Sequence, residues 1–287
     1  MKLQALAEKT NSILPLLRCP LCGEAFSLRD TQSLVCKNNH CYDLSRKGYI
    51  NLAPSHGQQA DKYSAALFEA RHKIFAEGFY APVMQAIGDA VEAHAPAGAP
   101  FSLLDAGCGE GSYAHALARR FPQANVIGLD LNRDAVTAAA RLPGPAHWLV
   151  GNLGRLPIAN GCLSFLLDVL TPADYGEFSR VLAPGGILLK VVPGQSYLSE
   201  IRNCLRQELR SGDYENHRVL SHLQKHACLL EQKTLCHTYP VTPEQGALFA
   251  RMTPMTFGLS PEALESIHIS AITIHLELMV CRMGRNA

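Results

Sequence analysis

The length and composition of the chain describe a globular protein that can bury a substantial core. With 287 residues and 47% hydrophobic side chains, it has room for one large domain and a smaller unit beside it. The formal net charge is +1, so no global field attracts the chain to nucleic acid and any such contact needs a local patch. The predominantly apolar segments 101–106 and 187–192, each of which includes one charged residue, fall far short of the roughly 18 residues of a membrane span. We therefore expect a soluble protein that does not enter a membrane.

The N-terminus and the cysteines bear on the compartment in which the protein works. Residues 1–17 have scattered leucines but neither the continuous apolar core nor the cleavage site of a secretory signal. Of the ten cysteines, four lie between residues 19 and 41, and six stand singly in mostly apolar contexts, which is typical of buried thiols. We expect a cytoplasmic protein in which residues 1–17 are a poorly constrained leader with at most a short helix.

Four potential metal ligands crowd into residues 18–53, a segment rich in turn residues and poor in apolar ones. They are Cys19, Cys22, Cys36 and His40. The spacing C-x2-C-x13-C-x3-H gives two close pairs joined by a hairpin-sized loop, which suits tetrahedral Zn²⁺. Cys41 is an alternative fourth ligand, and free or redox-active thiols are the alternative to a metal. Because four protein ligands leave no position for a catalytic water, the spacing predicts a structural zinc module.

After this module the predicted elements change from irregular to periodic. Residues 54–61 are polar and aperiodic, as in a linker, and the region 54–100 leads into the core through two predicted helices. From residue 101 strands and helices alternate, which indicates a parallel sheet with crossover helices. The expected strands are 101–105, 125–130, 147–150, 163–169, 186–192, 228–237 and 271–282. The expected helices are 62–76, 80–94, 112–120, 133–141, 173–182, 197–209 and 243–252.

A glycine-rich turn follows the first strand of this sheet. Gly107, Gly109 and Gly111 form the pattern G-x-G-x-G behind Asp105. The pattern differs from the dinucleotide fingerprint G-x-G-x-x-G and matches motif I of S-adenosylmethionine-dependent methyltransferases. Such a turn lets the backbone approach a ligand closely, and the helix that follows presents its N-terminus.

The ends of the next two strands complete a nucleoside site. Asp130 stands 19 residues beyond Gly111, where its carboxylate could accept hydrogen bonds from both ribose hydroxyls. Asn152 could bond the amino edge of an adenine ring, and Leu153 could pack on its face. The turn at 183–186 is typical of the approach to a methyltransferase fifth strand. We predict a class I, Rossmann-like α/β methyltransferase domain with a seven-stranded sheet over 101–287, against the alternative of a nucleotide-free sheet with incidental glycines.

With these motifs in order, the chain from about residue 18 onward resembles the RlmA family, the 23S rRNA (guanine-N1)-methyltransferases. The shared motifs are CysProLeuCys at 19–22, LysGlyTyrIleAsnLeu at 47–52, AspAlaGlyCysGlyGluGlySerTyr at 105–113, ProGlyGly at 184–186 and MetThrPro at 252–254. The resemblance implies a homodimer that uses S-adenosylmethionine to methylate N1 of a guanine in a hairpin loop of 23S rRNA, with the zinc module assisting RNA recognition.

The resemblance also implies particular cofactor contacts. They fall on Tyr80, Gly109, Glu110 and Tyr197, the last of which stands where the family has histidine. A second departure follows the fourth strand, where the segment 168–173 replaces the family's Tyr-(Ser/Ala)-Pro-Cys.

The mechanism leaves the general base open. The enzyme chiefly aligns guanine N1 with the sulfonium methyl and excludes water, and the N1 proton must leave. Asp168 and the segment 252–254 are the candidate bases, although Asp168 could instead cap a turn. The side chains that could hold a flipped base are Tyr113, Tyr175 and Phe257. A phosphate-facing patch could comprise Lys37, Arg46, Lys47, Lys62, Arg71 and Lys73, a set that an ordinary solvated face would also carry.

Three other functions fit parts of the sequence. A class I methyltransferase of a small molecule would share the core but has no evident need for a zinc module. A non-catalytic RNA- or protein-binding protein would not need the intact glycine turn and Asp130. A relative that modifies a neighbouring guanine of the same loop differs only in the methylated base.

Overall fold

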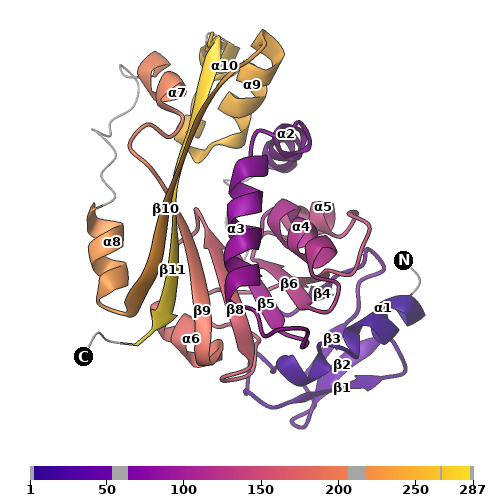
Figure 1. The fold of residues 1–287 in the computed structure, drawn as a ribbon. Helices are drawn as coiled ribbons and strands as arrows, with labels where there is room; N and C mark the ends of the chain where they lie inside the picture. The colour runs from indigo at the N-terminus through magenta and orange to yellow at the C-terminus, as the bar shows by residue number, and fades with distance from the viewer. Residues whose placement is uncertain (1–2, 54–63, 206–216, 266, 285–287) are drawn as a thin grey trace.

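A computed structural model describes residues 3–53, 64–205, 217–265 and 267–284. Its centre is a mixed sheet with the strand order β10-β11-β9-β8-β5-β6-β7-β4 (Figure 1). The strands are β4 (Ile50–Asn51), β5 (Ser102–Ala106), β6 (Asn125–Asp130), β7 (His147–Val150), β8 (Leu163–Val169), β9 (Leu182–Pro193), β10 (Ala227–Pro240) and β11 (Ala271–Met283). All seven expected strands are confirmed, and β11 runs antiparallel to both β9 and β10.

The expected count of seven strands is one too low for the described sheet, because β4 joins its edge. This two-residue strand comes from the N-terminal module and pairs in parallel with β7, Ile50 opposite Leu149. The amide of Leu52 continues the ladder by donating to the carbonyl of Val150 (2.8 Å). A strand of two residues has no periodicity from which a sequence pattern could reveal it.

Helices cover both faces of the sheet, which is why β7 and β8 are buried almost continuously rather than at alternate positions. One core contains side chains of α3 (Ala81–His94), α4 (Ser112–Arg120) and α5 (Arg133–Ala139). The opposite core contains side chains of α6 (Tyr175–Val181) and α8 (His217–Gln224) together with the N-terminal module. The helix α8 had no counterpart among the expected elements.

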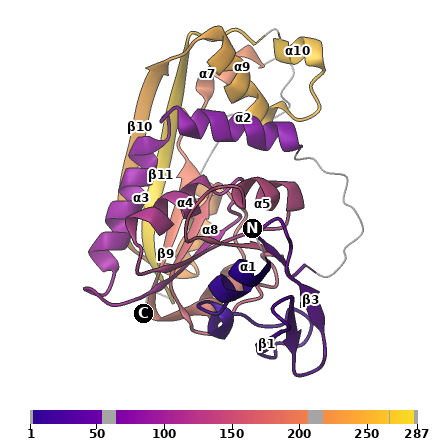
Figure 2. The ribbon, with the colours of Figure 1, turned by 90° about the vertical axis from the view of Figure 1, so that its right-hand side faces the viewer.

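Above the carboxyl ends of the parallel strands lies a layer of further helices. Figure 2 shows α2 (Ala65–Ala76) as a bar across the molecule above α4 and α5. It packs against α9 (Pro243–Met252), which begins with a capping box between Thr242 and Gln245. The remaining elements here are α7 (Ser199–Cys204), the 3-10 turn η2 (Pro254–Thr256) and α10 (Pro261–Glu265). The expected helix 197–209 is therefore shorter, and its last four residues lie outside the described ranges.

The N-terminal module is a three-stranded antiparallel sheet of β1 (Phe26–Arg29), β2 (Ser33–Cys36) and β3 (Cys41–Asp43). Residues before it differ from the expected poorly constrained leader. They form α1 (Leu3–Thr10) and the turn η1 (Leu14–Leu16), and the side chains of Leu6, Ile13 and Leu17 are buried. Lys9 Nζ donates to the carbonyls of Gly144 (3.1 Å) and Ala146 (2.5 Å), which fastens α1 beside β7. No helix within the described ranges is long and apolar enough to cross a membrane.

The packing of α1 predicts that it stabilises the fold. We expect Leu6→Ala to lower the free energy of unfolding by about 2–3 kcal/mol, because it removes a buried side chain and leaves a cavity. Gln4→Ala is the control, since Gln4 is exposed on the same helix. Urea denaturation of both variants measures the difference. Equal stability of the two variants would show that α1 is not packed as described.

Candidate cofactor and metal sites

The glycine turn after β5 is held by the end of β6. The amides of Gly107 and Cys108 donate to the carbonyl of Leu129 (2.8 and 3.0 Å), and the Gly109 amide donates to Asp130 Oδ2 (2.9 Å). All three glycines of the turn have positive φ, at +80°, +55° and +88° in chain order, a conformation that other residues rarely adopt. The expected turn therefore lies at the carboxyl edge of the sheet, between β5 and β6.

The three glycines have different neighbours. A Cβ at Gly107 would lie 2.5 Å from Thr171, and one at Gly111 would lie 2.6 Å from the Trp148 ring. At Gly109 the nearest atoms belong to Phe68 and Arg71 of α2, 3.9 and 4.0 Å away. Gly107 and Gly111 are thus required for close packing, whereas Gly109 faces α2 at ordinary contact distance.

A cluster of buried polar side chains lies between this turn and α2. Six buried side-chain atoms of the described residues lack a hydrogen-bond partner, and four belong to Arg71 (Nε), Asp105 (Oδ2), Glu110 (Oε2) and Tyr113 (OH). Arg71 Nε and Glu110 Oε2 form an ion pair at 3.1 Å, but their geometry makes no hydrogen bond. Buried polar groups are ordinarily satisfied, so this cluster fits a polar ligand such as the amino-acid part of S-adenosylmethionine.

Burial changes the protonation of the cluster. Asp105 is 1% exposed, and burial, followed by repulsion from Glu110, raises its pKa to about 8, against the opposing effects of the Ala114 amide and Arg71. Burial likewise raises the pKa of Asp130, although the amides of Asn132 and Gly109 oppose this. The site thus gathers three carboxyl groups around one guanidinium, an arrangement that favours a cationic ligand.

Tyr80 and Tyr197, two expected cofactor contacts, meet beside this cluster. Their hydroxyls lie 2.8 Å apart, and the Tyr80 ring stacks on Phe75 with a centroid distance of 4.5 Å. Burial raises the pKa of both hydroxyls, so both stay neutral. One hydroxyl donates to the other, and the accepting hydroxyl keeps its own proton to donate to a ligand. Tyr197 precedes Leu198, whose φ of +50° is rare outside glycine and whose amide donates to Thr273 O (2.8 Å). The tyrosine at position 197 therefore takes part in a fixed aromatic wall.

The nucleoside end of the site has both expected and unexpected members. Asp130 Oδ1 accepts from the Asn132 amide (2.8 Å), which leaves each oxygen of this carboxylate a further lone pair. The structure does not bring Leu153 to the cluster, because its half-buried side chain packs against the core shared with the N-terminal module. Leu131, which sequence reasoning missed, follows Asp130 directly and is 46% exposed, so it offers an apolar surface at the end of β6.

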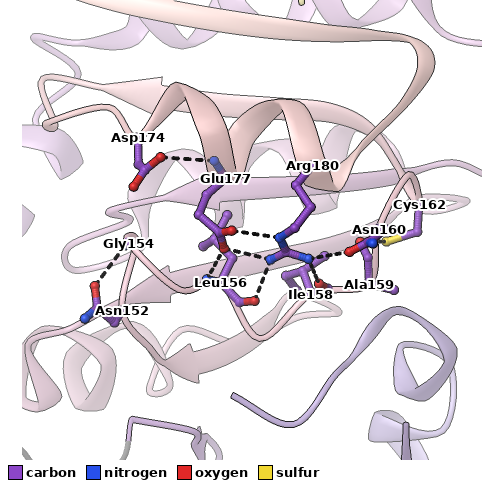
Figure 3. Close-up of polar contacts among 10 residues, drawn as sticks. All are labelled: Asn152, Gly154, Leu156, Ile158, Ala159, Asn160, Cys162, Asp174, Glu177 and Arg180. Atoms are coloured by element: carbon purple, nitrogen blue, oxygen red, sulfur yellow. Dashed lines mark hydrogen bonds and ion pairs between the residues drawn. The ribbon is translucent and has the colours of Figure 1, made fainter. Parts of the chain in front are cut away.

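Asn152 begins a tight turn that polar contacts tie to its surroundings (Figure 3). Its Oδ1 accepts from the Gly154 amide (2.9 Å), and its carbonyl accepts from the Arg155 amide (3.1 Å). Arg180 of α6 fixes the rest of this loop: its guanidinium donates to the carbonyls of Leu156 and Ile158 and pairs with Glu177. Since Asn152 Oδ1 accepts a hydrogen bond within the turn, the Nδ2 group is the part of this side chain that keeps its donors for a ligand.

Asp168, the candidate base, lies deep in the sheet. It is 0% exposed and pairs with Lys190 on the neighbouring strand (2.7 Å). Burial raises its pKa to about 6, although Lys190 opposes this. Lys190 Nζ also donates to the carbonyl of Thr171 (2.8 Å), so the pair fixes the turn that ends β8. Asp168 Oδ1 has no hydrogen-bond partner among the described residues.

The expected metal ligands converge in the N-terminal module. The ligand atoms of Cys19, Cys22, Cys36 and His40 all lie within 4.8 Å of one another. His40 Nδ1 lies 3.5 Å from Cys19 Sγ and 3.4 Å from Cys36 Sγ, and the sulfurs of Cys22 and Cys36 lie 3.6 Å apart. A tetrahedron with Zn–S bonds of about 2.3 Å has edges of about 3.8 Å, whereas a disulfide needs about 2.05 Å. These residues therefore fit zinc.

Two backbone turns shape this metal site. Gly23 (φ +77°) and Asn39 (φ +61°) adopt left-handed conformations, and their amides donate to the carbonyls of Cys19 (2.8 Å) and Cys36 (2.9 Å). A hydrogen bond with the backbone of Glu24 lowers the pKa of the Cys22 thiol to about 6, which favours the thiolate that binds metal. Of the two candidates for the fourth ligand, His40 lies in the cluster.

Cys41 instead is exposed and accepts a hydrogen bond from Arg29 (3.1 Å). Lys37, Arg46 and Lys47, the members of the possible phosphate-facing patch within this module, are exposed.

Arg71 was expected among phosphate-facing residues, and the structure places it in the cofactor cluster. The sequence spacing of Arg71 could have indicated this position. Arg71 stands four residues after Leu67 and three before Ile74, both buried, so it lies on the buried side of α2. Among the other members of that patch, Lys73 pairs with Glu69 (3.0 Å), and Lys62 lies outside the described residues. Of the candidate base-holding side chains, Tyr113 and Tyr175 are buried, and Phe257 is 37% exposed.

Comparison with known proteins agrees with both parts of the structure. The family model described as "RlmA, N-terminal", a zinc ribbon, matches residues 17–60, and the model of a methyltransferase domain matches residues 103–186. The strand order and the glycine turn thus define a class I methyltransferase domain preceded by a zinc ribbon.

Two curated relatives extend this comparison to nearly the whole chain. The 23S rRNA (guanine(748)-N(1))-methyltransferase of Streptomyces fradiae is 30% identical over 94% of this chain and 98% of its own. YxjB of Bacillus subtilis, provisionally named a 23S rRNA (guanine-N(1)-)-methyltransferase, is 30% identical over 92% of this chain and 96% of its own. The chain belongs to the RlmA family of 23S rRNA (guanine-N1)-methyltransferases, as the sequence motifs predicted.

Similarity to methyltransferases of small molecules is confined to part of the chain. The trans-aconitate 2-methyltransferase of Acidovorax is 35% identical, but the match covers only 39% of this chain and 45% of that protein. These matches therefore cover a much smaller share of the chain than those to the rRNA methyltransferases.

The protonation of Asp105 predicts a pH effect on stability in the absence of cofactor. Because its folded-state pKa of about 8 lies above the ordinary 3.8, the folded chain binds more protons between these values and loses stability as pH rises. Asp105→Asn removes this titration. We therefore expect the free energy of unfolding of the variant minus that of wild type to be larger at about pH 9 than at about pH 5, by on the order of a few kcal/mol.

Urea denaturation at both pH values measures this change, with Asp89→Asn as control. Asp89 is exposed, and its hydrogen bond with Arg120 lowers its pKa, so it stays ionised throughout this range and its effect should not change. A pH-independent effect of Asp105→Asn would contradict the assigned protonation.

Proposed function

We propose that the protein transfers the methyl group of S-adenosylmethionine to N1 of a guanine in a hairpin loop of 23S rRNA. The proposal depends on two features that this one chain combines. One is a ribbon with four converging metal ligands, and the other is a glycine turn beside buried polar groups that lack hydrogen-bond partners among the described residues. The two relatives described above support the acceptor, since their names specify N1 of guanine in 23S rRNA.

The chain's own residues would divide the work of binding. Asp130 would offer carboxylate lone pairs to the ribose hydroxyls, the Asn152 Nδ2 group would donate to the adenine edge, and the Tyr80–Tyr197 pair would offer one neutral hydroxyl donor. The cofactor supplies an electrophilic methyl group on a sulfonium centre. The layer of α2 and α9 above the site would exclude water from it.

The N1 proton needs an acceptor, and Asp168 stays the candidate. Its unpartnered Oδ1 and a pKa of about 6 are suitable for proton uptake near neutral pH. Its complete burial means that it would act from beneath the turn at Thr171, so contact with the base requires the end of β8 to move. The ion pair with Lys190 gives Asp168 a structural role in any case.

The acceptor is tested by methylation of RNA that lacks the modification. Purified protein is incubated with methyl-labelled S-adenosylmethionine and 23S rRNA from a strain without the enzyme. We expect label at a single hairpin loop and a reverse-transcription stop there, because N1 methylation blocks the Watson–Crick edge of guanine. Absence of label in RNA from a protein that binds the cofactor would refute the rRNA acceptor and favour a small molecule.

The fourth zinc ligand is tested by a pair of neighbouring substitutions. We expect one zinc per chain in wild type, loss of that zinc in His40→Ala, and full retention in Cys41→Ser, since Cys41 lies outside the ligand cluster. Metal analysis of the purified variants measures this. Because structural zinc folds small modules, His40→Ala should also lower the melting temperature. If Cys41→Ser lost its zinc and His40→Ala kept it, Cys41 rather than His40 would be the fourth ligand.

We extend the proposal to assembly, which the family resemblance suggests, and to location, which the N-terminus and the single cysteines suggest. The protein would act as a homodimer in the cytoplasm, where its rRNA substrate is made. Light scattering of the purified protein distinguishes a dimer from the monomer mass of 31.2 kDa.

A further inference from the structure

Arg71 is a charged side chain beside the expected cofactor contacts, but it is not one of them. Its side chain projects from α2 and is 24% exposed, and the guanidinium carbon lies 5.5 Å from the Phe75 ring centroid. A Cβ on Gly109 would be 4.0 Å from its Cζ. Burial lowers the pKa of Arg71, but Glu110 and the neighbouring tyrosines outweigh this and raise it. The side chain is therefore a permanent cation at the glycine turn.

The ion pair of Arg71 with Glu110 does not explain why either side chain is buried. Glu110 is 2% exposed and their contact distance is 3.1 Å, yet neither Arg71 Nε nor Glu110 Oε2 makes a hydrogen bond among the described residues. A buried ion pair offsets the cost of desolvation only when its geometry is good and its remaining donors and acceptors are satisfied. This pair lacks both, so it fits a third charged group that would satisfy both partners.

The charges around Arg71 restrict what that group can be. Asp105 and Glu110 are almost fully buried beside it, and Asp130 is close enough for all three carboxyl groups to interact electrostatically. An RNA phosphate, which carries only negative charge, would meet these carboxylates as well as the guanidinium. A zwitterion carries an ammonium group and a carboxylate on one carbon atom, so it can give each member of the pair an opposite charge.

We propose that Arg71 binds the carboxylate of the methionine part of S-adenosylmethionine, while Glu110 receives its ammonium group. This inference rests on the proposed cofactor and is independent of the RNA acceptor. The planar guanidinium can hold a carboxylate with two parallel hydrogen bonds, which lysine cannot do. Because Arg71 belongs to α2 and Glu110 to the glycine turn, the bound amino acid joins the covering helix to the sheet edge.

The test compares two ligands that differ in the amino-acid part. S-adenosylhomocysteine carries it, and methylthioadenosine has the same adenosine and thioether without it. In calorimetric titrations we expect Arg71→Ala to weaken binding of S-adenosylhomocysteine about 10- to 100-fold, as for a lost charged hydrogen bond. Binding of methylthioadenosine should change less than about twofold on the same principle.

Two further variants separate charge, geometry and folding. Lys73→Ala is the matched control on α2, because Lys73 is exposed and pairs with Glu69, and neither ligand should be affected. Arg71→Lys keeps the charge without the planar fork and should lie between Arg71→Ala and wild type. Should Arg71→Ala unfold, wild-type protein titrated with decarboxylated S-adenosylhomocysteine gives the same comparison, and we expect the same loss.

Each other outcome overturns a distinct claim. Equal weakening of both nucleosides by Arg71→Ala, or undiminished binding of S-adenosylhomocysteine, would refute the carboxylate contact while leaving the proposed function intact. Failure of wild-type protein to bind S-adenosylhomocysteine at all would refute the cofactor, and with it both proposals. Since no RNA is present, a wrong acceptor does not affect the result.

Discussion

The cofactor site depends on Asp130, which joins the three turns at the carboxyl edge of the sheet. Its Oδ2 accepts from the Gly109 amide after β5, and its Oδ1 accepts from the Asn132 amide after β6. Its backbone carbonyl accepts from the Gly151 amide after β7 (3.0 Å). A single residue thus fixes the relative positions of the glycine turn, the start of α5 and the turn of Asn152. Buried carboxylates cost free energy unless they are hydrogen-bonded, and these contacts offset that cost.

The zinc ribbon is physically continuous with this edge. Its strand β4 extends the main sheet beside β7. The Arg18 amide donates to the carbonyl of Pro157 in the loop after β7 (3.0 Å), and the Ala159 amide of the same loop donates to the carbonyl of Leu16 in η1 (2.7 Å). Arg155 Nη2 donates to the carbonyl of Leu21, which lies between the first two cysteine ligands (2.9 Å). The turn that begins at Asn152 therefore ends at Arg155, which contacts the backbone between the metal ligands Cys19 and Cys22. These contacts join the ribbon to the turn of Asn152, so the ribbon is more than an appended module.

Sequence patterns predicted the parts of this structure that depend on local spacing. The seven strands from residue 101 onward followed from alternation of apolar segments, and the four metal ligands from paired spacing. The parts that were missed depend on tertiary contacts. The two-residue strand β4 has no period, and the burial of α1 depends on its packing into the core shared with β7. Arg71 sat in an apolar stripe, but only the fold brings that stripe over Glu110.

A crystal structure of the protein with S-adenosylhomocysteine and zinc would test the assignment of both sites most directly. We expect the nucleoside along the carboxyl ends of β5 and β6, with its ribose hydroxyls on the Asp130 carboxylate and its amino-acid part under α2. We also expect one zinc ion held by Cys19, Cys22, Cys36 and His40. A nucleoside bound elsewhere, or bound without contact to Asp130, would show that this edge of the sheet is not the cofactor site.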